Sequence, residues 1–233
     1  MTLLEIIKEF CRRTGIPAPV SVANSGDDQA LQMMGLLNEV LGVLEERKAY
    51  TFLQAEAVFV SIEGEDQGLL ESLAPGFVSF LDSLLFNRTT NEVILGPVSS
   101  ANWQSQAAGM TSLSETQFRV KNGRLFLSPA PAAGNTIAFE YKSRYAVYLD
   151  PNLKPYFTSD LDTCRYPDEL MILGLRYIWR KEKGLRYAEN FRDFEVKVTN
   201  LAGNDGGNAP YILDGAPPSI PGISIPDRGW NVT

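Results

Sequence analysis

Histidine is absent from the 233 residues, and this absence removes several classes of active site and metal site. Ser-His-Asp and Cys-His nucleophile pairs, histidine acid-base catalysis and histidine-ligated zinc all need an imidazole. Cysteine occurs only at Cys11 and Cys164, which are far apart and form no CxxC pair, so we expect neither a disulfide framework nor a thiolate metal site. The sequence therefore predicts no catalytic residue, no metal and no cofactor.

The chain also lacks a long apolar run and an excess of positive charge. Its longest uncharged stretch, residues 93–114, is rich in Ser, Asn, Gln, Gly and Pro, and no run approaches the roughly 20 apolar residues of a membrane span. Glu5 and Glu9 interrupt the apolar N-terminal segment, unlike in a signal peptide. The net charge of −7 argues against general nucleic-acid binding, and we expect no membrane contact.

Helical periodicity is present at both ends of the chain. Thr2 and Glu5 form a capping box before a first helix, and Asp27 or Asp28 caps a longer second helix. Pro167 and the acids after it begin a third helix, which Gly184 ends, and a fourth is expected over about 185–201. The stripes expected to be buried in the last two helices are Leu170, Leu173, Gly174, Tyr177 and Ile178, then Tyr187, Phe191, Phe194, Val198 and Leu201.

Between these helices, residues 50–149 change to the alternating pattern of strands. Val58, Val60 and Ile62 share one face of a strand, and Asn122-Gly123 predicts a tight type I′ hairpin turn. A further hairpin is expected from 84–86 and 93–95, and a short helix from Ser99 or Ser100 that carries Trp103. Residues 136–148 predict one long strand.

The order of these elements predicts an α+β fold. A helical bundle is formed by an N-terminal helix pair (1–49) and a C-terminal helix pair (150–202), and an antiparallel β domain (50–149) is inserted between them. Residues 203–233 form an extended arm, because six Gly and five Pro leave too little apolar surface to fold alone. The arm either lies on its own domain or orders on a partner, and its apolar residues favour a partner. These partner-binding residues are Tyr211, Ile212, Leu213, Ile220, Ile223, Ile225 and Trp230.

Three groups of charged residues are candidate sites. Glu63, Glu65 and Asp66 are the closest approach to a glycosidase-type acid pair, but their place in a predicted hairpin turn favours a solvated turn. Asp160 and Asp162 are expected in solvent before a helix. The basic group could face phosphate, although a solvated helix end is the simpler interpretation; it comprises Arg176, Arg180, Lys181, Lys183 and Arg186.

Four segments, in this order, resemble the head-to-tail adaptor proteins of tailed bacteriophages. They are FCRRTGIPAP…DDQALQMMGLLNEVLGVLEERKAY, LAPGFVSFLDSLLFNRTTNEVILGPVSSANWQ, FRVKNGRLFLSPAPAAGNTIAFEYKSRY and FTSDLDTCRYPDELMILGLRYIWRKEKGLRYAENFRDFE. They are similar to the helix pairs, the hairpin with its Trp-bearing helix, and the β stretch of the upper tail-tube (tail tubular A-type) adaptors of short-tailed phages. The resemblance covers almost the whole chain before the arm.

The resemblance implies a structural virion protein at the head-tail junction, made in the cytoplasm of the bacterial host. Such proteins form a ring of about twelve copies below the portal protein, with helical bundles side by side and C-terminal segments reaching the portal. The β domain faces a nozzle or tail-tube protein, and DNA passes through the channel to ejection without specific recognition. We expect the acidic balance to repel phosphate and let DNA slide.

Two alternatives remain open from the sequence. A tail-associated β domain could bind host-surface glycan through residues 50–149 without any portal. Less favoured is a polysaccharide hydrolase that uses Glu63, Glu65 and Asp66.

Overall fold

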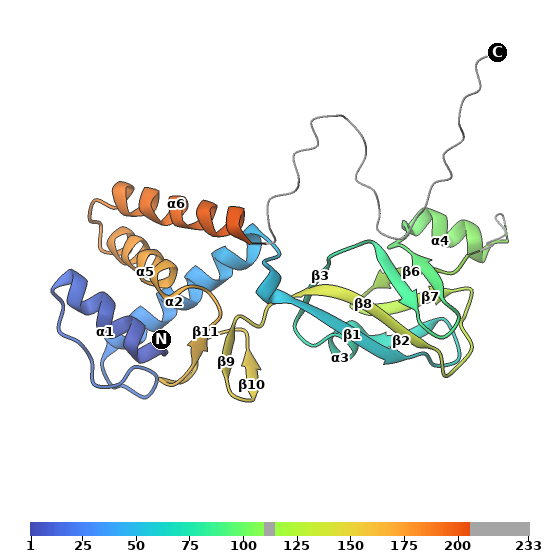
Figure 1. Ribbon diagram of the computed structural model, residues 1–233, viewed down its shortest axis with the longest axis horizontal. Helices are drawn as coiled ribbons and strands as arrows, with labels where there is room; N and C mark the ends of the chain where they lie inside the picture. The colour runs from blue at the N-terminus through green and yellow to red at the C-terminus, as the bar shows by residue number, and fades with distance from the viewer. Residues whose placement is uncertain (110–114, 206–233) are drawn as a thin grey trace, which may run out of the picture.

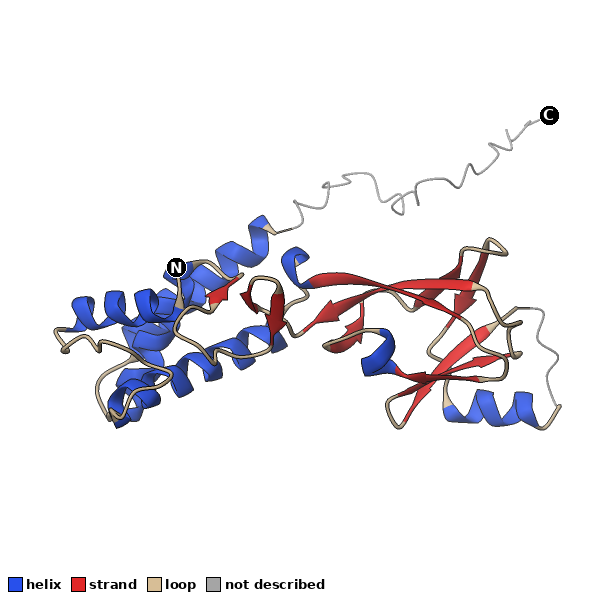
Figure 2. Ribbon diagram, turned by 90° about the horizontal axis from the view of Figure 1, so that it is seen from below, coloured by secondary structure: helices blue, strands red, loops and turns tan. Residues whose placement is uncertain are grey.

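The computed structural model describes residues 1–109 and 115–205 and shows a mixed α+β chain. Four helices gather at one end of an elongated molecule, and a large curled sheet forms the other end (Figures 1 and 2). These helices are α1 (Leu3–Thr14), α2 (Asp28–Arg47), α5 (Asp168–Glu182) and α6 (Ala188–Asn204). The arm residues named above, between Tyr211 and Trp230, lie outside the described ranges.

Local capping signals determine where the helices begin. The side chain of Thr2 accepts a hydrogen bond from the Glu5 N–H, and the Glu5 carboxylate accepts one from the Thr2 N–H, which confirms the predicted capping box. The Asp27 carboxylate accepts from the Gln29 N–H and caps α2. Pro167 is the residue before the first turn of α5, one position earlier than expected. α6 begins at Ala188 rather than near Leu185, because the chain needs residues 183–187 to reverse direction after α5.

One hydrophobic core joins the four helices. The rings of Phe10 in α1 and Trp179 in α5 pack edge to face, with centroids 5.8 Å apart. The ring of Tyr177 in α5 stacks on that of Phe194 in α6, with centroids 5.6 Å apart. Gly174 lies where three helices converge, since a Cβ there would come within 2.6 Å of Val40 Cγ1 and 3.1 Å of Phe194 Cε2. Phe194 and Val198 are buried as predicted, whereas Tyr187 and Phe191 are exposed.

A small sheet belongs to this helical end. Its strands are β9 (Val147–Leu149), β10 (Asn152–Lys154) and β11 (Thr163–Cys164), and an isolated bridge joins Thr163 to Thr2. The prediction of one long strand over 136–148 is therefore wrong. The strand ends at Ser143, and Val147 is buried with Phe157 in the hydrophobic core of the four helices.

The large sheet has the strand order β1-β8-β4-β5-β6-β7-β2, with β3 also paired to β8. All its pairs are antiparallel except β5 with β6. The strand bounds are Gln54–Val60 (β1), Asp66–Leu69 (β2), Phe77–Phe80 (β3), Leu84–Asn87 (β4), Glu92–Leu95 (β5), Gln117–Lys121 (β6), Arg124–Ser128 (β7) and Thr136–Ser143 (β8). The 3₁₀ turn Thr51–Leu53 precedes β1, and the short helices are α3 (Leu70–Leu73) and α4 (Ser100–Ala107).

The sheet curls around a core of its own. Its buried residues include Phe59, Phe118 and Phe139 from three different strands. The hairpin at Asn122-Gly123 has the two positive φ angles, 51° and 69°, that its turn requires, and β4 pairs with β5 as expected. Ser99 caps α4 through the Asn102 N–H, and Trp103 is buried against Phe126. No helix in residues 1–109 and 115–205 combines the length and apolar character of a membrane crossing.

Candidate functional site

The apolar face predicted for the first strand of the sheet is its exposed face. Val58 is 49% exposed and Val60 and Ile62 are more so, whereas Ala57 and Phe59 are buried in the core of the sheet. Period-2 alternation assigns residues to two faces, but it does not say which face a second layer covers. Over residues 57–60 this strand is apolar on both faces, and its larger aliphatic side chains share the outward face with Gln54 and Glu56.

Exposed apolar residues of three strands, β1, β4 and β5, lie on one face of the sheet, and the buried Ala138 of β8 lies between those of β1 and β4. In the register of the ladders, Val58 lies opposite Ala138, Ala138 opposite Phe86, and Phe86 opposite Val93. Phe86 and Val93 are 46% and 45% exposed. Leu84 and Leu95 form the adjoining pair, two residues along the same two strands. We call this surface the outer sheet face: Val58, Val60, Leu84, Phe86, Val93 and Leu95.

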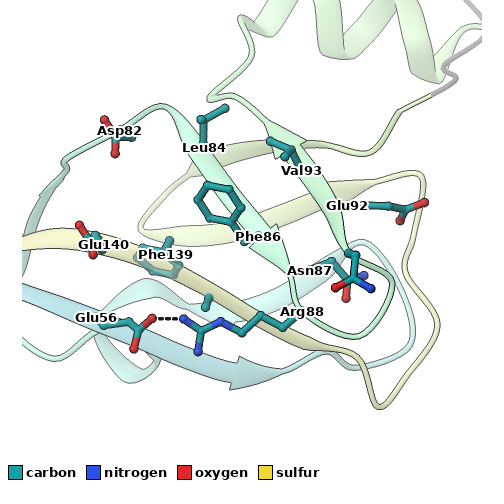
Figure 3. Close-up of a pocket in the computed structure, with 12 residues that line it drawn as sticks. Glu56, Asp82, Leu84, Phe86, Asn87, Arg88, Glu92, Val93, Phe139 and Glu140 are labelled. Atoms are coloured by element: carbon teal, nitrogen blue, oxygen red, sulfur yellow. Dashed lines mark hydrogen bonds and ion pairs between the residues drawn. The ribbon is translucent and has the colours of Figure 1, made fainter. Parts of the chain in front are cut away.

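A groove of about 540 Å³ runs over the outer sheet face, and carboxylates surround it. Figure 3 shows the Phe86 ring in its middle, with Asp82 and Glu140 on one side and Glu92 on the other. Arg88 forms an ion pair with Glu56 and is the only cation in the lining that the structure describes. A second hollow of about 330 Å³ shares Glu92 and Val93 with the groove and extends past Leu95 to Glu115.

This composition suits a macromolecular contact. Contiguous exposed apolar residues with a polar rim mark interaction sites, because single exposed apolar residues are common but large patches are rare on monomers. Four carboxylates against one guanidinium favour a partner surface that carries Lys or Arg around apolar side chains. Within the described residues, no group of three or more Cys, Asp or Glu is arranged to hold a metal ion.

Glu63, Glu65 and Asp66 do not have the arrangement of a catalytic acid pair. The Asp66 carboxylate accepts a hydrogen bond of 2.8 Å from Arg124 Nε, and a further one from the Gly68 N–H. The Arg124 hydrogen bond holds the pKa of Asp66 below its ordinary value, which is opposite to the shift of a general acid. Glu63 and Glu65 are exposed in the turn, as expected.

Asp160 and Asp162 are not the solvated residues that the sequence predicted. Asp162 is 0% exposed and accepts hydrogen bonds from Lys154 Nζ and from the Thr158 and Ser159 N–H groups, at 2.7, 2.7 and 2.8 Å. The Asp160 carboxylate accepts from the N–H groups of Val22 and Ala23. Asp160 therefore holds the segment before α2, which is distant in sequence, whereas the Asp162 carboxylate organises its own loop.

Both thiols are structural. Cys11 and Cys164 are buried and unpaired, and burial raises both pKa values, that of Cys164 to about 12. A protonated buried thiol is a poor nucleophile.

The basic residues gather around the turn between α5 and α6, away from the outer sheet face. Arg176 and Arg180 lie one helical turn apart on α5, and Arg186 follows in the turn. The sequence pattern indicates this basic group as a candidate site, but it does not indicate the outer sheet face. The available signal was the run of residues 57–60, which is apolar on both faces of a strand.

No protein-family model and no curated protein matches the chain.

Proposed function

We propose that this protein is a structural virion protein, the head-to-tail adaptor of a tailed bacteriophage. About twelve copies form a ring between the portal and the tail and surround the DNA channel. The proposal rests on the resemblance of four ordered segments to such adaptors. The observation that supports it best is the outer sheet face, an apolar docking surface at the end of an elongated molecule.

In this proposal the four helices form a bundle of an N-terminal pair, α1 and α2, and a C-terminal pair, α5 and α6. The bundles of neighbouring copies pack side by side, which gives the repeated heterologous contact that a closed ring needs. The sheet end, which runs from β1 to β8, contacts the next tail protein through the outer sheet face. The arm that orders on the portal begins after α6, which ends at Asn204, and not at residue 203 as the sequence predicted.

Charge supports this choice of partner for the outer sheet face. Its groove carries Glu56, Asp82, Glu92 and Glu140 around Phe86, so a tail protein with apolar side chains flanked by Lys or Arg complements it. The central, half-exposed Phe86 is an aromatic residue, a type that is enriched at protein interfaces.

The portal ring of the same phage provides the test of the adaptor function. We expect the purified chain to have the mass of a monomer alone, and to add a ring of copies when the portal ring is present. Deleting residues 206–233 removes only residues after Asp205, so we expect the same unfolding transition but no ring. Mass photometry and negative-stain images measure both. A monomer in every mixture contradicts the proposal, and a ring without portal contradicts assembly on a portal template.

The outer sheet face is tested separately with a double variant, Phe86→Thr and Val93→Thr. Threonine keeps a high strand propensity, and both residues are half-exposed, so we expect the free energy of unfolding to change by less than about 1 kcal/mol. We expect binding to the tail protein below the adaptor to weaken at least about tenfold. The control variant, Val20→Thr and Leu161→Thr, removes two exposed apolar residues at the helical end and should bind normally. Equal binding by both variants contradicts this docking site.

One observation favours host glycan as a second candidate ligand. Sugar-binding grooves combine an exposed aromatic ring with carboxylates, and Phe86 lies beside Glu56 and Glu140. Titration of the monomer with polysaccharide from the host surface separates the two, because only the glycan function predicts binding without portal or tail protein.

A further inference from the structure

A second groove lies at the far end of the molecule from the sheet, at the turn between α5 and α6 (Figure 1). Two adjoining hollows of about 290 and 720 Å³ share Arg180 and Leu185 in their linings and together make up this groove. The C-terminal turn of α1, the last turns of α5 and the first residues of α6 line it. We call it the arginine groove, after Arg13, Arg176, Arg180 and Arg186.

The charge of the arginine groove is opposite to that of the whole chain. Four guanidinium groups line it, and Glu189 is the one carboxylate that the structure describes in the lining. Residues 176–186 contain five Lys or Arg and one acid, in a chain with a net charge of −7. The positive charge is therefore concentrated around one hollow.

These guanidinium groups differ in how far the protein itself neutralises them. Arg13 forms ion pairs with Glu9 and Glu169 at 2.8 and 2.7 Å, so its charge is balanced. Arg180 is oriented by two neutral acceptors, Asn190 Oδ1 at 2.9 Å and the Arg186 carbonyl at 3.4 Å, which leave its charge uncompensated. The side chains of Arg176 and Arg186 have no hydrogen bond or ion pair with any residue in 1–109 or 115–205.

We propose that the arginine groove binds phosphate groups of a DNA backbone. Guanidinium groups donate paired hydrogen bonds that match phosphate oxygens, and Arg176, Arg180 and Arg186 offer three such groups without a competing carboxylate partner. Tyr187, the residue before α6, makes no capping hydrogen bond with its side chain. The N–H groups in the first turn of α6 therefore remain available beside the same groove.

The lining favours an anionic ligand. Four guanidinium groups lie beside one carboxylate, that of Glu189, and three of them have no carboxylate partner within the described residues. The choice of DNA rests on the proposed function, in which the chain surrounds a DNA channel. For this groove it replaces the expectation, drawn from the net charge of −7, that the protein only repels phosphate. Phosphate contacts carry no sequence information, so such binding would position DNA without recognising its sequence.

The test measures fluorescence anisotropy of a labelled 20-base-pair duplex with the full chain between about 50 and 200 mM salt. We expect binding at low salt, and at least about tenfold weaker binding by the double variant Arg176→Gln and Arg186→Gln. Each lost phosphate contact lowers the slope of log affinity against log salt by about one, so the variant should lose about two. The control variant, Lys8→Gln and Lys121→Gln, removes the same charge from exposed sites outside the groove and should bind like the wild type.

Each outcome decides for or against the arginine groove. No binding by the wild type at low salt overturns it, as does equal weakening by both variants, which would show a general charge effect. Equal binding of a poly-glutamate peptide would assign the groove to acidic protein segments instead. DNA binding by a chain that forms no ring with portal would contradict the adaptor function alone, and a ring without DNA binding would contradict the groove alone.

Discussion

Replacing Asp162 by Asn is expected to lower the free energy of unfolding by about 3 kcal/mol, because it breaks a buried charge pair. The fully buried carboxylate accepts hydrogen bonds from Lys154 and from two backbone N–H groups. An amide keeps the shape, but it loses the charge and places an NH₂ donor where a second acceptor is needed. The Asp162 carbonyl also accepts from the Leu3 N–H, so the start of α1 depends on the same loop.

Urea unfolding followed by circular dichroism measures this loss. The matched control is Asp193→Asn on α6, which makes the same chemical change at an exposed position and should alter unfolding by less than about 0.5 kcal/mol. A similar small effect at Asp162 would mean that Lys154 and the loop find other partners.

The direction of the Asp162 pKa shift predicts how the stability of Asp162→Asn depends on pH. Burial opposes ionisation of Asp162, but hydrogen bonds from Lys154, Thr158 and Ser159 outweigh it, so its folded pKa is lowered. A lowered folded pKa gives stability that is fully present above the unfolded pKa of about 4 and is lost as pH falls through the folded value. We therefore expect the stability of Asp162→Asn to fall less steeply than wild type below about pH 4.

Gly174→Ala is expected to destabilise the helical end by about 2 kcal/mol, against the usual preference of helices for alanine. A new Cβ would approach Val40 Cγ1 to 2.6 Å, and Phe194 leaves little room on the other side. Overpacking of this kind costs about 1–3 kcal/mol, which exceeds the gain of up to about 1 kcal/mol in helix propensity.

Gly35→Ala in α2 is the control, because nothing lies within 4 Å of its Cβ position. We expect it to raise the free energy of unfolding by up to about 1 kcal/mol. The two substitutions are chemically identical and should have opposite signs in thermal or urea unfolding of the isolated chain. A stabilising Gly174→Ala would show that α2 can move away from α5.

The helices were predictable because their signals are local. The capping box of Thr2 and Glu5 and the cap at Asp27 each act within one turn, so the residues that form them are neighbours in sequence. The Asn122-Gly123 hairpin is local for the same reason. The short elements β2, α3 and β3 were missed, since residues 66–80 carry neither alternation nor a helical stripe.

The arrangement of the sheet and the burial of Asp162 depend on distant segments. β8 pairs with β1, β3 and β4, which precede it by at least about 50 residues, and no local pattern specifies those pairings. The same is true of the outer sheet face, because its residues become one surface only through the order β1-β8-β4-β5. Asp162 appears as part of a polar loop in sequence, and it becomes buried only when β10 and α1 pack around it.

The end of α6 has a mechanical consequence. The Asp205 carboxylate accepts hydrogen bonds from the Thr51 N–H and hydroxyl, and Lys48 Nζ donates to the Ala202 and Asp205 carbonyls at 2.7 and 2.9 Å. Residue 205 is thus fastened beside the first residues that lead into β1. Tension applied to the chain beyond residue 205 would reach these hydrogen bonds before it reached the rest of α6. A pull on the arm would therefore be transmitted to the connection between the helices and the sheet.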